Sequence, residues 1–220
     1  MTDLITFLTR RLSHGLPGRP SQIKMAPKPV SGGQARKMEA PEHAHQSSVL
    51  VLLFPNHENK IELTLTLRSN DIDHGGQISF PGGRAEEGET AVETALREAH
   101  EEIGICSQDV SILGKLSELY VNHSNNRVIP IVGFMEQRPE FNVNPDEVEE
   151  IFTVELDSLL LKKNLTVEDW DLRSHTYKVP YWDVHRVPLW GATAMMLSEL
   201  LDLYREFLRE IEEKWPPEKH

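Results

Sequence analysis

The amino-acid sequence predicts an α/β protein in which helices pack on a mixed β-sheet. Residues 61–67 alternate apolar and polar side chains with a period of two, which is typical of a strand. Apolar side chains recur at helical spacing in residues 92–103, and they do so again between Trp190 and Trp215. A length of 220 residues is enough for one sizeable core and short for two full domains.

Residues 1–46 are expected to form an N-terminal helix and an extended arm, which precede a domain of residues 47–215. The apolar spacing at the start predicts a short amphipathic helix that uses Leu4, Phe7, Leu8 and Leu12. From His14 to Gln46 the chain is rich in proline and glycine, which favours an extended arm over the alternative of a disordered linker.

The first strand of the domain is predicted at residues 47–54, where a continuous apolar run is typical of a buried strand. Residues 61–67 follow after a polar connection, so the two strands are expected to form a hairpin.

Residues 112–119 and 127–135 are further strand candidates, and Pro130 lies inside the second. Because proline has no backbone N–H to donate, Pro130 predicts a sheet edge or a bulge at this position. A short helix is expected at residues 153–160 and a strand at residues 178–184.

The composition excludes several classes of protein. Asp and Glu number 35 against 23 Lys and Arg, and the resulting formal net charge of −12 argues against binding to long nucleic acid. No apolar run approaches the roughly 18–20 residues that a membrane span needs, and Asp3 gives the N-terminus a charge order unlike that of a secretory signal. The single cysteine, Cys106, excludes an intrachain disulfide and a cysteine-rich zinc site, so a reduced, cytoplasmic setting is expected.

The helix at residues 92–103 has clear signals at both ends. Thr90 and Glu93 have the spacing of a capping box, and Gly104 fits the position after the last turn. Its predicted buried stripe consists of Val92, Leu96, Ala99 and Ile103.

An acidic cluster on this helix requires an explanation. Glu98, Glu101 and Glu102 lie on one helical face, where like charges destabilise a helix by a few tenths of a kcal/mol per pair. A solvated charged face is the simplest interpretation. A phosphate-binding loop at "GRAEEG" is excluded, because Glu89 stands where a lysine is needed. A divalent cation with oxygen ligands would reverse the repulsion and keep the carboxylates ionised.

The stretch "GRAEEGETAVETALREAHEEIGI", residues 83–105, resembles the Nudix box. Every fixed position of that motif is filled, by Gly83, Glu89, Arg97, Glu98, Glu101, Glu102 and Gly104. From ordinary residue frequencies, a chance match somewhere in the chain is on the order of one in a million. The resemblance therefore favours a metal site over a solvated face.

The resemblance implies a Nudix fold, which is an α/β/α sandwich with a mixed sheet. It also implies an enzyme that hydrolyses a nucleoside diphosphate linked to another moiety. In such a protein Glu98, Glu101 and Glu102 would ligate Mg²⁺ or Mn²⁺, and the backbone carbonyl of Gly82 or Gly83 would assist.

Supporting and catalytic residues follow from the same resemblance. Arg97 would orient a carboxylate of its own helix by a charge-assisted hydrogen bond, and Glu89 would support the site. A carboxylate has to accept the proton of the water that attacks phosphorus. Glu101 is the candidate inside the motif and Glu147 the candidate outside it. The alternative for Glu147 is an exposed residue at the start of a helix, after Pro145.

Two further stretches of sequence narrow the range of possible substrates. "LTLRSNDIDHGGQISFPGG", residues 65–83, resembles the upstream signature of the coenzyme A pyrophosphatase branch, and "LWGATAMMLSELL", residues 189–201, is similar to its C-terminal helix. Asp73 departs from the upstream signature because it replaces a second arginine, and the gap to Gly76 is one residue short. The residues expected to contact the substrate are Arg68, Ser69, Gly76, Phe80 and Gly82.

This resemblance implies hydrolysis of coenzyme A or acyl-coenzyme A to 3′,5′-ADP and 4′-phosphopantetheine products. Arg68 is the candidate contact to the 3′-phosphate, and its alternative is an ion pair with Asp71 or Asp73 at a sheet edge. ADP-ribose, NADH or a dinucleoside polyphosphate is the alternative substrate. A non-catalytic nucleotide sensor is a further alternative, although the motif retains all of its carboxylates. The sequence leaves open whether the chain is a monomer or a homodimer.

Overall fold

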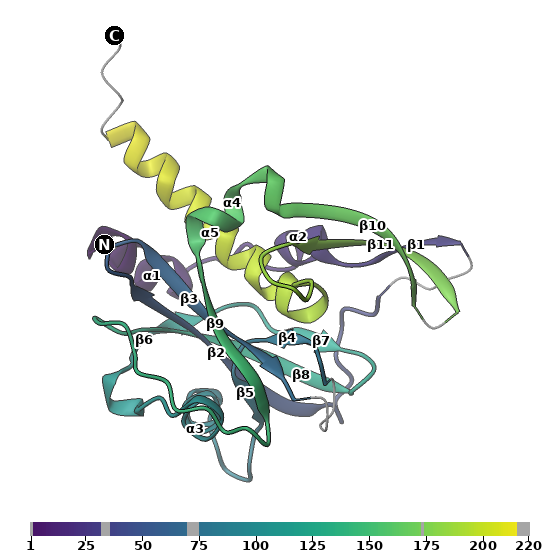
Figure 1. Cartoon of the computed structure of the whole chain (residues 1–220), viewed down its shortest axis with the longest axis horizontal. Helices are drawn as coiled ribbons and strands as arrows, with labels where there is room; N and C mark the ends of the chain where they lie inside the picture. The colour runs from purple at the N-terminus through teal and green to yellow at the C-terminus, as the bar shows by residue number, and fades with distance from the viewer. Residues whose placement is uncertain (1, 32–35, 70–74, 173, 215–220) are drawn as a thin grey trace.

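The computed structural model describes residues 2–31, 36–69, 75–172 and 174–214. Its largest sheet has the strand order β4-β3-β2-β8-β6, with β5 beside β2, β7 beside β8 and β9 beside β3 (Figure 1). The strands of this sheet are β2 (His45–Pro55), β3 (Ile61–Arg68), β4 (Ile78–Ser79), β5 (Gly82–Arg84), β6 (Ser111–Lys115), β7 (Leu119–Val121), β8 (Asn126–Phe134) and β9 (Val148–Glu155). β2 and β8 are parallel and β2 and β3 are antiparallel, so the sheet is mixed, as predicted.

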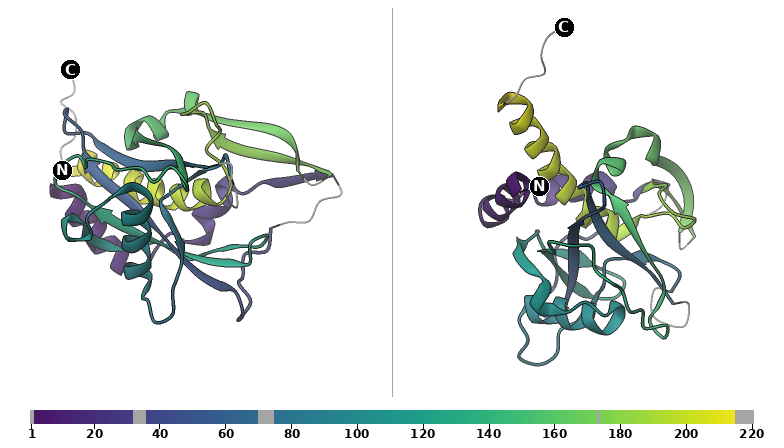
Figure 2. Two further views of the ribbon diagram at one scale, coloured as in Figure 1. Left: turned by 60° about the horizontal axis from the view of Figure 1, so that its bottom comes forward. Right: turned by 60° about the vertical axis from the view of Figure 1, so that its left-hand side comes forward.

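Helices cover both faces of this sheet, which confirms the predicted α/β/α sandwich. The helix α3 (Ala91–Ile103) packs on one face, and α1 (Thr2–Ser13) and α5 (Gly191–Lys214) pack on the other (Figures 1 and 2). Strand β2 supplies both cores by alternation. Leu50, Leu52 and Phe54 belong to the α3 core, whereas Val51 and Leu53 belong to the core under α1 and α5. None of the helices that the structure describes is long and apolar enough to cross a membrane.

A second, smaller sheet pairs a strand from the N-terminal part of the chain with two strands from the C-terminal part. It has the order β1-β11-β10, all antiparallel, with β1 (Lys28–Ser31), β10 (Leu165–Leu172) and β11 (His175–Trp182). Figure 1 shows it extending to the right of the large sheet. The remaining short elements are α2 (Arg19–Gln22), α4 (Leu156–Leu160) and the 3-10 turns η1 (Ile23–Met25), η2 (Ser107–Asp109) and η3 (Lys162–Asn164).

Most of the predicted elements are present. β2 and β3 form the predicted hairpin, and α1 buries the four residues predicted for its apolar face. The α5 helix is also confirmed, within the described residues, up to Lys214. In residues 153–160 only the second half is helical, because the first three residues end β9. The strand predicted at residues 178–184 begins earlier, at His175.

The strand predicted at residues 112–119 is wrong in one respect, because the structure divides it into β6 and β7. At the break, the backbone N–H of Ser117 points to the carboxylate of Glu199 on α5, and its hydroxyl donates to the same group at 2.7 Å. These bonds replace the ladder bonds that a continuous strand would make.

Pro130 predicted a sheet edge or a bulge, and the sheet edge is wrong. The register shift between β6 and β8 lies opposite Val132 and Gly133, not at Pro130. β8 lies inside the sheet, between β2 on one side and β6 and β7 on the other. Pro130 is located opposite the break between β6 and β7, where its carbonyl accepts a hydrogen bond from the N–H of Leu116 at 2.9 Å. A proline is tolerated in this inner strand because the neighbouring strand is interrupted at that position.

Candidate metal centre and adjoining cavity

The helix α3 carries most of the candidate site, and its ends are as predicted. Thr90 Oγ1 accepts from the N–H of Glu93, and the N–H of Thr90 donates to the Glu93 carboxylate at 2.8 Å, so the capping box is complete. Gly104 ends the helix with a left-handed φ of 73°. The buried stripe is rotated slightly from the predicted one, because Ala95 is buried while Val92 and Leu96 are only half-buried.

Two glycines bring β5 close to this helix. A Cβ on Gly82 would lie 2.3 Å from the carbonyl oxygen of Ser48, and the φ of Gly82 is 152°. A Cβ on Gly83 would lie 2.4 Å from the carboxylate of Glu98. Without side chains at these positions, the N–H of Gly82 reaches Glu102 Oε2 at 3.1 Å. The glycine pair therefore places backbone polar groups directly beside the helical carboxylates.

Three carboxylates converge at this point. Glu98, Glu102 and Glu147 each place an oxygen within 4.8 Å of the others. Glu147 comes from a turn before β9, and that turn is held by a hydrogen bond from the N–H of Asn144 to the backbone oxygen of Glu102 at 2.9 Å. The interpretation of Glu147 as an exposed residue at a helix start is wrong, because the chain continues into a strand and Glu147 is only partly exposed.

Burial makes this cluster electrostatically unfavourable. Glu102 is 1% exposed, and burial raises its pKa to about 7, although Arg68 and the N–H of Gly82 oppose the rise. Burial also raises the pKa of Glu98. Carboxylate oxygens that converge in this way are the ligands that a hard divalent cation prefers, so the residues present fit such an ion.

Arg97 holds the surrounding carboxylates in place. It forms a two-pronged pair with Glu89, at 2.7 and 3.1 Å, and its Nη1 donates to both Glu98 and Glu101 at 3.0 Å. The Arg97 guanidinium lowers the pKa of Glu89 to about 2. Glu101, unlike Glu98, has a half-exposed side chain and is not part of the three-carboxylate group.

A cavity of about 780 Å³ opens beside the carboxylates, between the large sheet, the small sheet and the start of α5. Of the five residues predicted to contact the substrate, Arg68, Phe80 and Gly82 line it. Phe80 is also part of the core, with 1% of its surface exposed.

Ser69 and Gly76 do not line this cavity within the described residues. The N–H of Ser69 donates to the backbone oxygen of Glu147, and the N–H of Gly76 to that of Arg68. Arg68 itself lies beside the metal-site carboxylates, with Nη1 3.5 Å from Glu102 Oε1. Asp71 and Asp73 lie outside the described residues.

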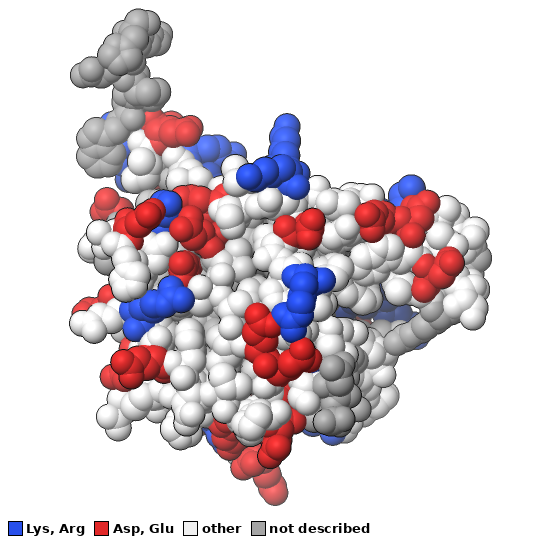
Figure 3. Space-filling view, viewed as in Figure 1, with Lys and Arg blue, Asp and Glu red and all other residues white. Residues whose placement is uncertain are grey.

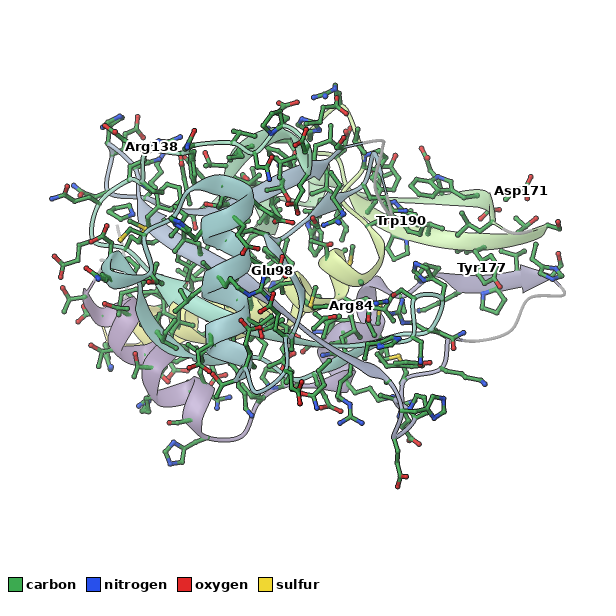
Figure 4. All side chains as sticks on the ribbon, turned by 90° about the horizontal axis from the view of Figure 1, so that it is seen from below. Arg84, Glu98, Arg138, Asp171, Tyr177 and Trp190 are labelled. Atoms are coloured by element: carbon green, nitrogen blue, oxygen red, sulfur yellow. The ribbon has the colours of Figure 1, made fainter. Side chains whose placement is uncertain are left out.

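Sequence reasoning missed several residues of this cavity. Tyr177 on β11 and Trp190 before α5 line it, and Figure 4 shows them on the side of the small sheet. Arg36, Ser47, Arg84 and Asn126 also line it. The apolar run of residues 47–54 places Ser47 on a predicted strand, but no local signal indicates that these distant segments meet. Arg36 in particular lies in the segment that was expected to be an arm.

Comparisons with known proteins identify relatives of this chain. A family model described as a NUDIX domain matches residues 44–175. Nudix hydrolase 3 of Caenorhabditis elegans is 35% identical over 165 residues, which cover 66% of this chain and 68% of that protein. The mitochondrial Nudix hydrolase 15 of Arabidopsis thaliana is 34% identical over 160 residues. That match covers 69% of this chain but only 56% of the plant protein.

A solved structure has the same fold. RenU, a Nudix hydrolase from M. smegmatis, matches with a TM-score of 0.51 at 17% identity, and the match covers 84% of this chain and 100% of that chain.

Proposed function

Since this chain belongs to the Nudix hydrolases, which act on a diphosphate bond, we propose that its substrate is coenzyme A or an acyl-coenzyme A. The products would be 3′,5′-ADP and 4′-phosphopantetheine or its acyl ester. The alternative remains another nucleoside diphosphate derivative, such as ADP-ribose, NADH or a dinucleoside polyphosphate.

One observation supports coenzyme A more than any other. The two stretches that resemble the coenzyme A pyrophosphatase branch are far apart in sequence, yet both contribute to the same cavity. The upstream stretch, residues 65–83, contributes residues 77–80 and the two glycines of β5 to the cavity. The stretch at residues 189–201 contributes residues 190–193 and Met196. Gly83 lines the cavity and also lies against the carboxylate of Glu98, so the cavity adjoins the metal centre.

Members of this family use divalent cations, and here Glu98, Glu102 and Glu147 would hold Mg²⁺ or Mn²⁺, with the carbonyl of Gly83 as an additional ligand. The ion would neutralise the diphosphate and stabilise the charge that develops on the phosphoryl oxygens. Glu101 would contribute less to binding of the ion than the sequence suggests, because its side chain is half-exposed and hydrogen-bonded to Arg97.

The residues around the ion would divide the remaining tasks. Arg97 would hold Glu98 in position while Glu89 fixes Arg97 from the other side. Glu147 is a better candidate than Glu101 for the base that accepts the proton of the attacking water. One of its carboxylate oxygens would bind the ion, and the other would be placed to accept that proton. Arg68 was predicted from the sequence to contact the 3′-phosphate. Because it lies beside Glu102, we propose instead that it contacts the diphosphate.

A substrate panel tests this function. The enzyme with Mg²⁺ or Mn²⁺ is offered coenzyme A, acetyl-coenzyme A, ADP-ribose, NADH and diadenosine tetraphosphate, and the products are identified by mass. The proposal requires kcat/KM for coenzyme A to exceed that for the others. In ¹⁸O-water the label must enter a phosphate group of one product, whereas label in a carboxylic acid would indicate thioester cleavage. Preference for ADP-ribose or NADH would refute the substrate and leave the diphosphate chemistry intact.

A further inference from the structure

We propose that Arg36 and Arg84 form a second anion-binding subsite in the cavity, which binds a phosphomonoester of the substrate at a position separate from the diphosphate. This inference rests on the proposed function in one respect, namely that the 3′-phosphate of coenzyme A would be the group bound. The N-terminal segment, outside the residues that match the family model, would then contribute to substrate selection.

The distribution of arginines is the first support. Of the arginines that the structure describes, nine have a carboxylate oxygen within 4.0 Å, as an acidic chain leads one to expect. Within that part of the chain, Arg36, Arg84 and Arg209 have none, and the first two line the same cavity. The only carboxylate among the described lining residues is Asp171, which already accepts a hydrogen bond from Thr176 Oγ1 at 2.8 Å.

The Arg36 guanidinium has a hydrogen-bond donor without a described partner and no described counter-charge, so a bound anion would stabilise it. Its Nη2 donates to the backbone oxygen of Tyr120 at 2.7 Å, but its Nε is buried and has no hydrogen-bond partner in the described structure. Burial lowers the pKa of Arg36, which is the direction expected for a cation that lacks a counter-charge. A half-buried cation that has no counter-charge among the described residues destabilises the fold, and an anionic ligand in the cavity would offset that cost.

The floor of the cavity adds neutral hydrogen-bonding groups beside the two arginines. Ser47 on β2 pairs in register with Arg84 on β5, so both side chains leave the same face of the sheet. Ser47 Oγ and Asn126 Oδ1 are buried and have no partner among the described residues. The amide nitrogen of Asn126 donates to Ser124 Oγ, which leaves its oxygen free to accept a hydrogen bond from a ligand hydroxyl. A phosphate that neighbours a ribose hydroxyl carries both the acceptors and the donor that these groups lack.

The proposed subsite uses residues other than the carboxylates of the candidate metal centre, although one of them, Arg84, is next in sequence to a residue that adjoins those carboxylates. Arg84 follows Gly83, which adjoins Glu98, and Figure 4 shows Arg84 between Glu98 and the small sheet. Arg68 lies beside Glu102, with Nη1 3.5 Å from its Oε1. The cavity therefore presents one arginine beside Glu102 and two further arginines that pair with no carboxylate among the described residues, which matches a ligand with a diphosphate and a separate phosphate.

Binding of products to the metal-free protein tests this subsite without catalysis. In EDTA, the Kd values of 3′,5′-ADP and of 5′-AMP are measured by calorimetry for the unaltered protein, Arg36→Gln and Arg84→Gln. Because a charge-assisted hydrogen bond is lost, each substitution should weaken 3′,5′-ADP binding by about tenfold. The Kd of 5′-AMP, which lacks the 3′-phosphate, should change by less than about twofold.

Arg209→Gln is the matched control, because it removes the same charge from an exposed arginine on α5 that has no carboxylate partner among the described residues. Its Kd for 3′,5′-ADP should equal that of the unaltered protein at the same ionic strength. If Arg36→Gln fails to fold, the exposed Arg84→Gln still decides the outcome. Unchanged 3′,5′-ADP binding in a folded Arg84→Gln protein would overturn the subsite.

Kinetics separate this inference from the proposed function. For the unaltered enzyme, kcat/KM for coenzyme A should exceed that for dephospho-coenzyme A, and both arginine variants should reduce this ratio. Hydrolysis of coenzyme A with an unchanged ratio in the variants would refute the subsite and retain the function. Selective, arginine-dependent binding of 3′,5′-ADP by a protein that does not hydrolyse coenzyme A would refute the function and retain the subsite.

Discussion

Glu102 combines a proposed functional role with a structural cost. Its side chain is buried against β5, accepts from the N–H of Gly82 and lies near Glu98 and Glu147. Its pKa is raised to about 7 from an ordinary 4.5. In the metal-free protein, the stability associated with this group is therefore fully present below pH 4.5 and is lost as the pH rises through about 7. A bound cation would remove the penalty.

Glu102→Gln should abolish turnover and stabilise the metal-free protein at alkaline pH. Glutamine keeps the acceptor for Gly82 but carries no charge, so at pH 8 the gain approaches about 3 kcal/mol. At pH 5 the gain should be much smaller, because the native carboxyl group is then mostly protonated. Thermal unfolding in EDTA at both pH values measures the difference. An equal shift in Tm at pH 5 and pH 8 would contradict the electrostatic explanation, and near-normal turnover would remove Glu102 from the metal centre.

The two candidate bases can be compared directly. Glu147→Gln should lower kcat by at least about a hundredfold, which is the lower range of general-base contributions. Glu101→Gln should lower it much less, since Glu101 is half-exposed and pairs only with Arg97 among the described contacts. The two substitutions are chemically identical, so each serves as the control for the other. A larger loss in Glu101→Gln would reverse the assignment.

Among the elements, the short strand β5 has the strictest steric requirement. Gly82 is compressed against the backbone of β2, and any side chain there would displace the N–H that reaches Glu102. Gly88 provides a contrast, because it also has a positive φ, of 88°, but nothing lies within 4 Å of its Cβ position.

Gly82→Ala should therefore destabilise the protein by more than about 2 kcal/mol and impair metal binding, because a backbone clash adds to the conformational strain. Gly88→Ala should cost only about 1 kcal/mol, the strain of a left-handed alanine, and leave metal binding unchanged. Denaturant unfolding and Mn²⁺ titration of both variants test this. Similar losses in the two variants would show that φ alone, and not the close approach, sets the requirement.

Elements with a strong local signal could be predicted from sequence, and elements that depend on distant partners could not. The capping residues Thr90 and Gly104 and the alternation in residues 61–67 are local, so α3 and the β2–β3 hairpin were correctly anticipated. The break between β6 and β7 depends on Glu199, about eighty residues away, and the inner position of Pro130 depends on that break. The residues of the Nudix-like motif indicated the carboxylates, whereas Arg36 and Trp190 reach the cavity only through the tertiary fold.

At the scale of the whole molecule, the N-terminal helix belongs to the main core. Leu8 on α1 is 1% exposed and packs in the same cluster as α5 and the large sheet, although it precedes the residues that match the family model. The domain limits at residues 46 and 47 stay a prediction. On the face shown in Figure 3, acidic and basic side chains are interspersed, and the described residues there form no continuous basic stripe.

Leu8→Ala should destabilise the protein by about 2–5 kcal/mol, because it leaves a cavity in the core. Thr9→Ala, at the neighbouring exposed position, should cost less than about 0.5 kcal/mol. Chemical denaturation of the two variants gives the comparison. Equal stability would mean that α1 is not part of the cooperative unit.

The candidate metal centre and the cavity are formed by different parts of the chain. The three converging carboxylates lie between residues 98 and 147, whereas walls of the cavity come from Arg36 near the beginning and from α5 near the end. Substitutions in the outer segments can therefore alter which molecule is accepted while the charge cluster stays intact. Because the carboxylates and the outer walls come from different segments, related proteins can keep one reaction and differ in substrate preference. During synthesis on the ribosome, all three converging carboxylates are made before the part of the cavity wall that α5 supplies.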